Sequence, residues 1–141
     1  MTIAPVIESL KSSPPRKPFF PNVVDVAAAA NRAAMLCVDR KSNDVVILNL
    51  KPLTDMTDYF VIASGTSDTH VRSVAEHVVT ELKKEGTPVY HVEGLAQGRW
   101  VLLDYVDFVV HIFHPALRSF YQLERLWGDA DVTPVGTATV G

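Results

Sequence analysis

The stretch Tyr59-Phe-Val-Ile-Ala-Ser-Gly-Thr-Ser-Asp68 decides the fold, because it passes directly from a strand to a helix. Residues 59–63 form a short apolar run, which is typical of a strand covered on both faces. Ser67 is a good N-cap, and Asp68 lies in the first helical turn, where a negative charge favours the helix dipole. A buried strand that leads into a capped helix predicts an α/β protein.

The helix after Asp68 is the strongest amphipathic segment of the chain. Its apolar residues recur at the three- and four-residue spacing of one helix face. These residues are Val71, Val74, Ala75, Val78, Val79 and Leu82. Lys83 and Lys84 favour the C-terminal turn, and Gly86 supplies a left-handed stop. We expect the apolar face to pack on a sheet.

Further elements lie on both sides of this helix. Asn22 can cap an earlier helix that carries Asp25 in its first turn. Pro115 fits the first turn of a final helix, which Gly128 ends. The predicted inner stripe of that final helix is Ala116, Phe120, Leu123 and Trp127.

Apolar runs predict the strands of the sheet. The predicted strands cover residues 44–50, 59–63, 89–92, 99–104 and 107–113. Only Tyr105 and Val106 separate the last two, so these should form an antiparallel hairpin. The order helix, two strands, helix, three strands, helix predicts a mixed sheet of about five strands with helices on its faces.

The predicted domain covers residues 21–128. Residues 1–20 contain prolines at positions 14, 15 and 18 and lack sustained periodicity, so we expect a flexible extension. Residues 129–141 are rich in Thr, Val and Gly and are expected to form a loose tail. The Pro-interrupted N-terminal segment does not resemble a secretory signal, and a transit peptide is the weaker alternative to a cytoplasmic location.

Composition limits the classes of partner. The formal net charge is −3 and the predicted domain has no cluster of Lys and Arg, so we expect contact with protein and little direct contact with RNA. No apolar run approaches the roughly 20 residues of a membrane helix, so no membrane partner is expected. Cys37 is the only cysteine, which excludes an internal disulfide and a thiolate metal cluster.

No arrangement of residues indicates catalysis. Asp104 and Asp107 flank the predicted hairpin turn, whereas nucleotidyltransferases carry two acids separated by one residue on a single strand. The segment 65–68 has one glycine and no following lysine, so it is not a phosphate-binding loop. The five histidines lack the spacing of a metal site. We therefore expect no cofactor, no metal and no enzymatic activity.

Trp100 and Tyr105 are the more suggestive residues. Trp100 opens a predicted strand, and Tyr105 lies at the turn that follows. Aromatic residues near sheet ends are commonly core residues, but they are also the types that dominate protein–protein hot spots. For an acidic domain without an active site, a binding surface is the favoured function.

Several segments together resemble the Iojap-like ribosomal silencing factors. The matching segments are Asp58-Tyr-Phe-Val-Ile-Ala-Ser-Gly-Thr-Ser-Asp-Thr-His-Val71, Val92-Glu-Gly94, Arg99-Trp-Val-Leu-Leu-Asp-Tyr-Val-Asp107, Val110-His-Ile-Phe-His-Pro115 and Tyr121-Gln-Leu-Glu-Arg-Leu-Trp127. Their order and spacing agree throughout residues 22–128. Relatives commonly carry glycine at the position of Val106, and valine disfavours positive φ there.

The resemblance implies a fold and a function. The fold is a nucleotidyltransferase-like α/β sandwich without the catalytic acids. Family members bind the large ribosomal subunit through its uL-type protein fourteen and block joining of the small subunit, which represses translation when nutrients are scarce. Organellar relatives assist large-subunit assembly, and homodimers are common. The resemblance places Trp100, Asp104, Tyr105 and Asp107 at the partner-binding site, with the two acids facing basic residues.

Overall fold

The computed structural model describes residues 25–121, 128 and 130–135, and the strand-to-helix stretch forms there as predicted. The described helices are α2 (Val26–Asp39), α3 (Asp68–Lys84) and α4 (Pro115–Tyr121). The described strands are β1 (Asn43–Asn49), β2 (Tyr59–Ser64), β3 (His91–Glu93), β4 (Trp100–Asp104), β5 (Phe108–Phe113) and β6 (Asp131–Pro134). This element order confirms the α/β prediction.

The strands form one mixed sheet in the order β3-β4-β5-β2-β1-β6. β2 and β5 run parallel at its centre, and the other described pairs are antiparallel. The predicted β4–β5 hairpin is confirmed, with Trp100 opposite Phe113. The sheet has six strands rather than about five, because Asp131–Pro134 pairs with the free edge of β1. The prediction of a loose tail is therefore wrong for these four residues.

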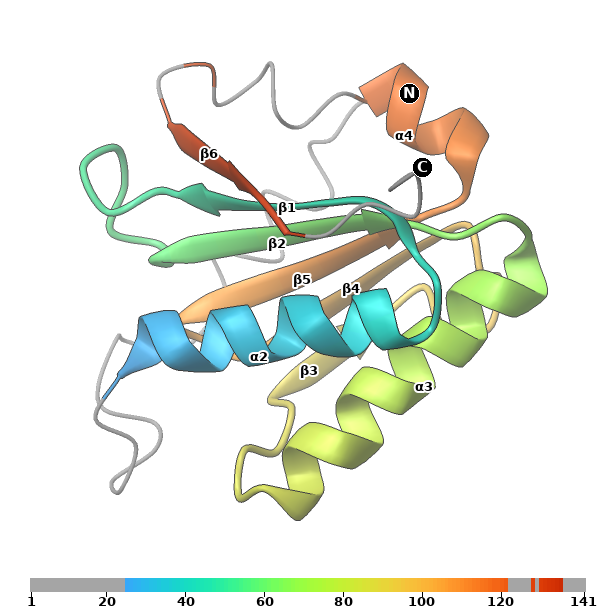
Figure 1. The fold of residues 1–141 in the computed structure, drawn as a ribbon, viewed down its shortest axis with the longest axis horizontal. Coiled ribbons are helices and arrows are strands. Elements are labelled where there is room, and N and C mark those ends of the chain that lie inside the picture. The colour runs from blue at the N-terminus through green and yellow to red at the C-terminus, as the bar shows by residue number, and fades with distance from the viewer. Residues whose placement is uncertain (1–24, 122–127, 129, 136–141) are drawn as a thin grey trace.

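Helices cover both faces of the sheet (Figure 1). α2 and α3 lie on one face, where their alanines and valines pack on inward-pointing residues of β1, β2, β4 and β5. Leu117 of α4 packs on the opposite face, against a second apolar cluster. The members of that cluster are Leu48, Leu50, Phe60, Ile62, Leu102, Val109 and Phe113. Because both faces are covered, β5 is buried along its whole length, as its apolar run predicts.

The ends of α3 follow the predicted signals. Ser67 is the N-cap, and its hydroxyl oxygen accepts a hydrogen bond from the His70 backbone N–H at 3.1 Å. At the other end the chain turns at Gly86, whose φ of +91° is readily adopted by glycine. The predicted cap and stop are confirmed.

The other two helices differ from prediction in detail. α2 begins at Val26 with Asp25 at its N-cap, so Asp25 does not lie in the first turn. Asn22, the predicted cap, lies outside the described residues. In α4 the predicted inner residue Ala116 is exposed, and the neighbouring Leu117 packs on the sheet instead. The side chains of Phe120, Leu123 and Trp127, the rest of the predicted stripe, lie outside the described residues.

Candidate functional site

The predicted binding residues lie on the β4–β5 hairpin. At its turn, the Asp107 N–H donates to the Tyr105 carbonyl at 2.8 Å, which closes a γ-turn around Val106. Val106 has a φ of +72°, a conformation that a β-branched residue rarely adopts. Val106 therefore adopts a backbone conformation that glycine adopts more readily, and the turn is strained.

The two aspartates of the hairpin are held within the fold. Asp104 is 2% exposed, and its Oδ1 accepts a hydrogen bond from the Val106 N–H at 2.7 Å. Asp107 is 7% exposed, and its carbonyl accepts from the Asp58 N–H at 2.9 Å, which joins the hairpin to the start of β2. The hydrogen bond that the Asp104 carboxylate accepts is typical of an aspartate at a turn.

Tyr105 lies in the core rather than on a binding surface. Its side chain is fully buried in the cluster beneath α2 and α3, and its ring stacks on Phe108 with centroids 4.8 Å apart. Burial raises the pKa of the Tyr105 phenol far above its usual range. The prediction that this side chain contacts a partner is at odds with its position. Tyr105 continues the alternation of β4, since Val101 and Leu103 lie in the same cluster.

Trp100 is the member of the predicted set that keeps exposed surface. It lies on the face of the sheet opposite α2 and α3, where its ring packs on Phe113 with centroids 4.7 Å apart. Its indole Nε1–H donates to His111 Nδ1 at 3.1 Å. Gly94 packs closely on the Trp100 backbone, since a Cβ at position 94 would overlap the Trp100 carbonyl oxygen.

His111 is the residue at this site that sequence reasoning missed. Its side chain is fully buried between Trp100, Phe60 and Phe113. Burial lowers the pKa of the imidazole to about 3, so His111 is neutral at ordinary pH. Strand alternation could have predicted His111, since a tight hairpin places residues 100 and 111 on the same face of the sheet.

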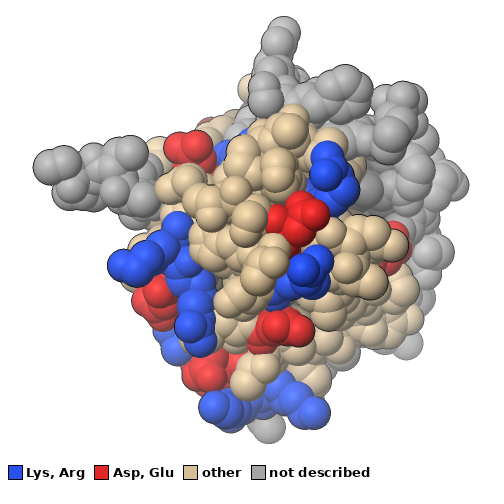
Figure 2. All heavy atoms as spheres, turned by 90° about the vertical axis from the view of Figure 1, so that its right-hand side faces the viewer, with Lys and Arg blue, Asp and Glu red and all other residues tan. Residues whose placement is uncertain are grey.

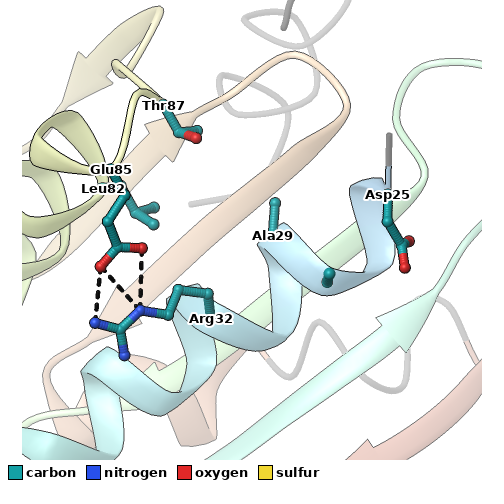
Figure 3. Close-up of a pocket in the computed structure, with 7 residues that line it drawn as sticks. Asp25, Ala29, Arg32, Leu82, Glu85 and Thr87 are labelled. Atoms are coloured by element: carbon teal, nitrogen blue, oxygen red, sulfur yellow. Dashed lines mark hydrogen bonds and ion pairs between the residues drawn. The ribbon is translucent and has the colours of Figure 1, made fainter. Parts of the chain in front are cut away.

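Two hollows lie away from the hairpin. One, of about 330 Å³, lies between α2 and the end of α3 (Figure 3). Beside it Arg32 and Glu85 point toward one another, and Arg32 Nη2 donates to Glu85 Oε2 at 2.8 Å. This hydrogen bond lowers the pKa of the Glu85 carboxyl. The guanidinium that borders this hollow is thus already paired with a carboxylate.

The second hollow, of about 450 Å³, lies beside the loop between β2 and α3. His70 spans this region: its Nδ1 accepts from the Thr66 N–H at 2.9 Å, and its Nε2 lies 2.7 Å from the Arg40 carbonyl oxygen. Both ring nitrogens therefore serve to join two loops. Among the described residues, no group of three or more His, Cys, Asp or Glu side chains is placed to hold a metal ion.

A comparison with known families assigns the chain. The family model described as "Ribosomal silencing factor during starvation" matches residues 24–139. The chain belongs to the ribosomal silencing factor family. The match extends past residue 128, where the sequence predicted the resemblance to end, and takes in β6.

Relatives of this silencing factor occur in bacteria and in organelles. The ribosomal silencing factor of Bacillus subtilis is 38% identical over 109 residues, which cover 77% of this chain and 87% of that protein. A mouse protein named mitochondrial assembly of ribosomal large subunit protein 1 is 34% identical over 89 residues, which cover 61% of this chain and 39% of the mouse protein. The relatives' names thus connect the family to silencing of ribosomes and to assembly of the large subunit.

Solved structures share the fold of this silencing factor. A crystal structure of a Chromobacterium violaceum protein superposes with a TM-score of 0.73 at 31% identity, covering 83% of this chain and 98% of that protein. A second, from Bacillus halodurans, has a TM-score of 0.62 at 37% identity, covering 68% of this chain and 90% of that protein. The six-stranded sheet with its helices is therefore an arrangement of this family.

One face of the protein carries charges of both signs. Figure 2 shows the face that includes the N-terminal end of α3, where basic and acidic side chains of the described residues are interspersed. Such a mixture lacks the single-sign field that binds nucleic-acid phosphates broadly. Within the described ranges, no helix is both long enough and apolar enough to cross a membrane.

Proposed function

We propose that this silencing factor docks on the large ribosomal subunit through a ribosomal protein, the uL-type protein fourteen, and thereby excludes the small subunit. The observation that carries the proposal is the family match over residues 24–139, which contains the whole Trp100 hairpin. Only binding is required for this activity, because a bound domain excludes a second partner from the same surface. Translation is repressed in the cytoplasm when nutrients are scarce.

Trp100 is the proposed contact residue. Its indole is partly exposed, packed on Phe113 and hydrogen-bonded to His111, so it forms a rigid aromatic anchor. Because Asp104, Tyr105 and Asp107 are buried, we propose that they shape the hairpin that presents Trp100. The net charge of −3, and the interspersed charges on the face in Figure 2, favour a protein surface over RNA as the main contact.

Co-sedimentation tests this proposal. The purified chain is mixed with purified large subunits and centrifuged through sucrose, and separately incubated with the isolated uL-type protein fourteen. We expect it to migrate with the subunits, to bind the isolated protein, and to reduce the yield of joined ribosomes when small subunits are added. Absence from the large-subunit fraction, together with failure to bind the isolated protein, rejects the proposal.

Assembly of the large subunit is the second candidate function. The name of the mouse relative favours it, and the same docking surface serves both functions. Ribosome profiles of a deletion strain distinguish the two. Accumulated precursor particles favour assembly, whereas normal particles with loss of starvation tolerance favour silencing.

A nucleotidyltransferase activity is the alternative that we reject. Asp104 and Asp107 are buried and flank a turn, and Asp104 Oδ1 accepts a backbone hydrogen bond, so this pair does not present a metal-binding surface. We expect no heat of binding when ATP or CTP with magnesium is titrated into the protein. A homodimer, which is common in relatives, is testable in the same samples by analytical ultracentrifugation.

A further inference from the structure

The hydrogen bond between Trp100 and His111 fixes the protonation of the histidine. The indole Nε1–H can only donate, so His111 Nδ1 must accept and the ring proton must lie on Nε2. Among the described residues, Nε2 has no hydrogen-bond partner. The neutral imidazole thus satisfies Trp100 and leaves its own donor buried and unsatisfied.

This arrangement lowers the stability of the fold, so stability does not explain why a histidine is present. A fully buried polar group with an unmade hydrogen bond lowers stability, whereas an apolar side chain of similar size does not. The other residues of β5 are apolar. The backbone of β5 pairs with β4 and β2 without the help of a polar side chain. A buried polar side chain that lowers stability is expected where the residue has a functional role.

The position of His111 indicates what it serves. Its ring lies beside the indole, tilted by 47° with centroids 6.0 Å apart, and Phe113, two residues further along β5, packs on the same indole. Phe113 contributes an apolar contact, which has no preferred direction of hydrogen bonding. The directional bond from Nε1 to Nδ1 selects one orientation and therefore one exposed edge.

We propose that His111 is a positioning residue for partner binding, which holds the Trp100 indole in its binding orientation and consumes its only hydrogen-bond donor. This inference rests on the proposed function. The partner then meets an indole surface without a free donor, so it offers an apolar or cationic side chain to Trp100 rather than a hydrogen-bond acceptor. A pre-oriented aromatic side chain also loses little rotamer freedom on binding.

Substitutions at position 111 separate positioning from folding. His111→Leu removes the acceptor and the unsatisfied donor together, so we expect stability equal to or above that of the wild type and affinity for large subunits about fivefold lower. His111→Asn places an amide oxygen close to the position of Nδ1, so we expect affinity within about twofold of the wild type. A folded His111→Leu variant with unchanged affinity overturns the proposal.

A double-mutant cycle with Trp100→Phe tests the route of the effect. Phenylalanine has no N–H, so His111→Leu should have no further effect on affinity in the Trp100→Phe background. The same fivefold loss in both backgrounds would show that His111 does not act through the indole, and would overturn the proposal.

The indole N–H signal tests the positioning without any partner. In ¹H–¹⁵N spectra, Trp100→Phe identifies the Trp100 Nε1–H resonance. We expect slow exchange of this proton with solvent in the wild type and in His111→Asn, and faster exchange in His111→Leu. If the wild type binds no large subunits, the proposed function fails, and equal exchange in all variants overturns the positioning inference separately.

Discussion

The Asp104 carboxylate accepts a hydrogen bond from the Val106 N–H at 2.7 Å, within a turn where Val106 has a φ of +72°. The Asp104 side chain thus gives the buried Val106 N–H an acceptor within the strained turn. The hairpin that presents Trp100 depends on this relationship.

Asp104→Ala is expected to destabilise the protein by about 1–3 kcal/mol, the range for leaving a buried hydrogen-bonding group unsatisfied. Asp104→Asn keeps an oxygen at the acceptor position and should lose less than half as much. Urea unfolding of the two variants measures the difference. Equal losses would indicate that the charge, rather than the acceptor, matters at this position.

Val106→Gly is expected to change stability by no more than about 1 kcal/mol. Glycine relieves a backbone strain of about 1–3 kcal/mol, which offsets the lost burial of the valine side chain. The control is Val109→Gly, in the middle of β5, where no positive φ is relieved and a loss of roughly 3 kcal/mol is expected. A Val106→Gly loss as large as that of Val109→Gly would contradict the strain.

Trp100→Ala is expected to weaken binding to large ribosomal subunits by about 2 kcal/mol or more, roughly thirtyfold, as for other aromatic hot spots. Met35→Ala is the matched surface control, because Met35 is exposed on α2, across the sheet from Trp100. Binding is measured by co-sedimentation at graded subunit concentrations, and folding by circular dichroism. An unchanged affinity in folded Trp100→Ala would remove this residue from the interface.

Stability should depend on pH through His111. The imidazole pKa falls from 6.5 to about 3 on folding, so below pH 6.5 the unfolded chain binds a proton that the native protein does not. This contribution is complete above pH 6.5 and is lost progressively down to pH 3. When the pH is lowered from 8 to 5, the free energy of unfolding should fall by about 2 kcal/mol more in the wild type than in His111→Leu. Urea unfolding at each pH measures this difference.

Cys37 should resist thiol reagents in the folded protein. Cys37 lies on the buried face of α2, where burial raises the pKa of its thiol to about 12, and only the thiolate is an effective nucleophile. At pH 8 we expect labelling at least about a thousandfold slower than in denaturant, limited by opening of the fold. Fast labelling of native protein would mean that α2 separates from the sheet without global unfolding.

Local signals in the sequence predicted α3 and the central strands. Ser67 and Gly86 mark the ends of α3 through backbone requirements that depend on a few neighbouring residues. The apolar runs of β2 and β5 report burial on both faces, which is again readable residue by residue.

Long-range contacts decided the features that were missed. Asp131–Pro134 has no strand pattern of its own and becomes a strand only because β1 offers an edge for pairing. Tyr105 is buried with Val101 and Leu103 on one side of the chain, a placement that depends on how far the alternation of β4 continues into the turn. The hydrogen bond between Trp100 and His111 can be predicted only when strand alternation is combined with the register of the hairpin.

The parallel pairing of β2 with β5 has a consequence for how the chain folds during its own synthesis. Phe60 pairs with Val109, and α3, β3 and β4 all lie between them. The β1–β2 hairpin can form early, but the centre of the sheet must wait until β5 has left the exit tunnel. Until then the apolar face of α3 has no complete sheet to cover it, and the nascent chain is exposed to aggregation. Folding is therefore expected in one late, cooperative step, when nearly all of the domain has been translated.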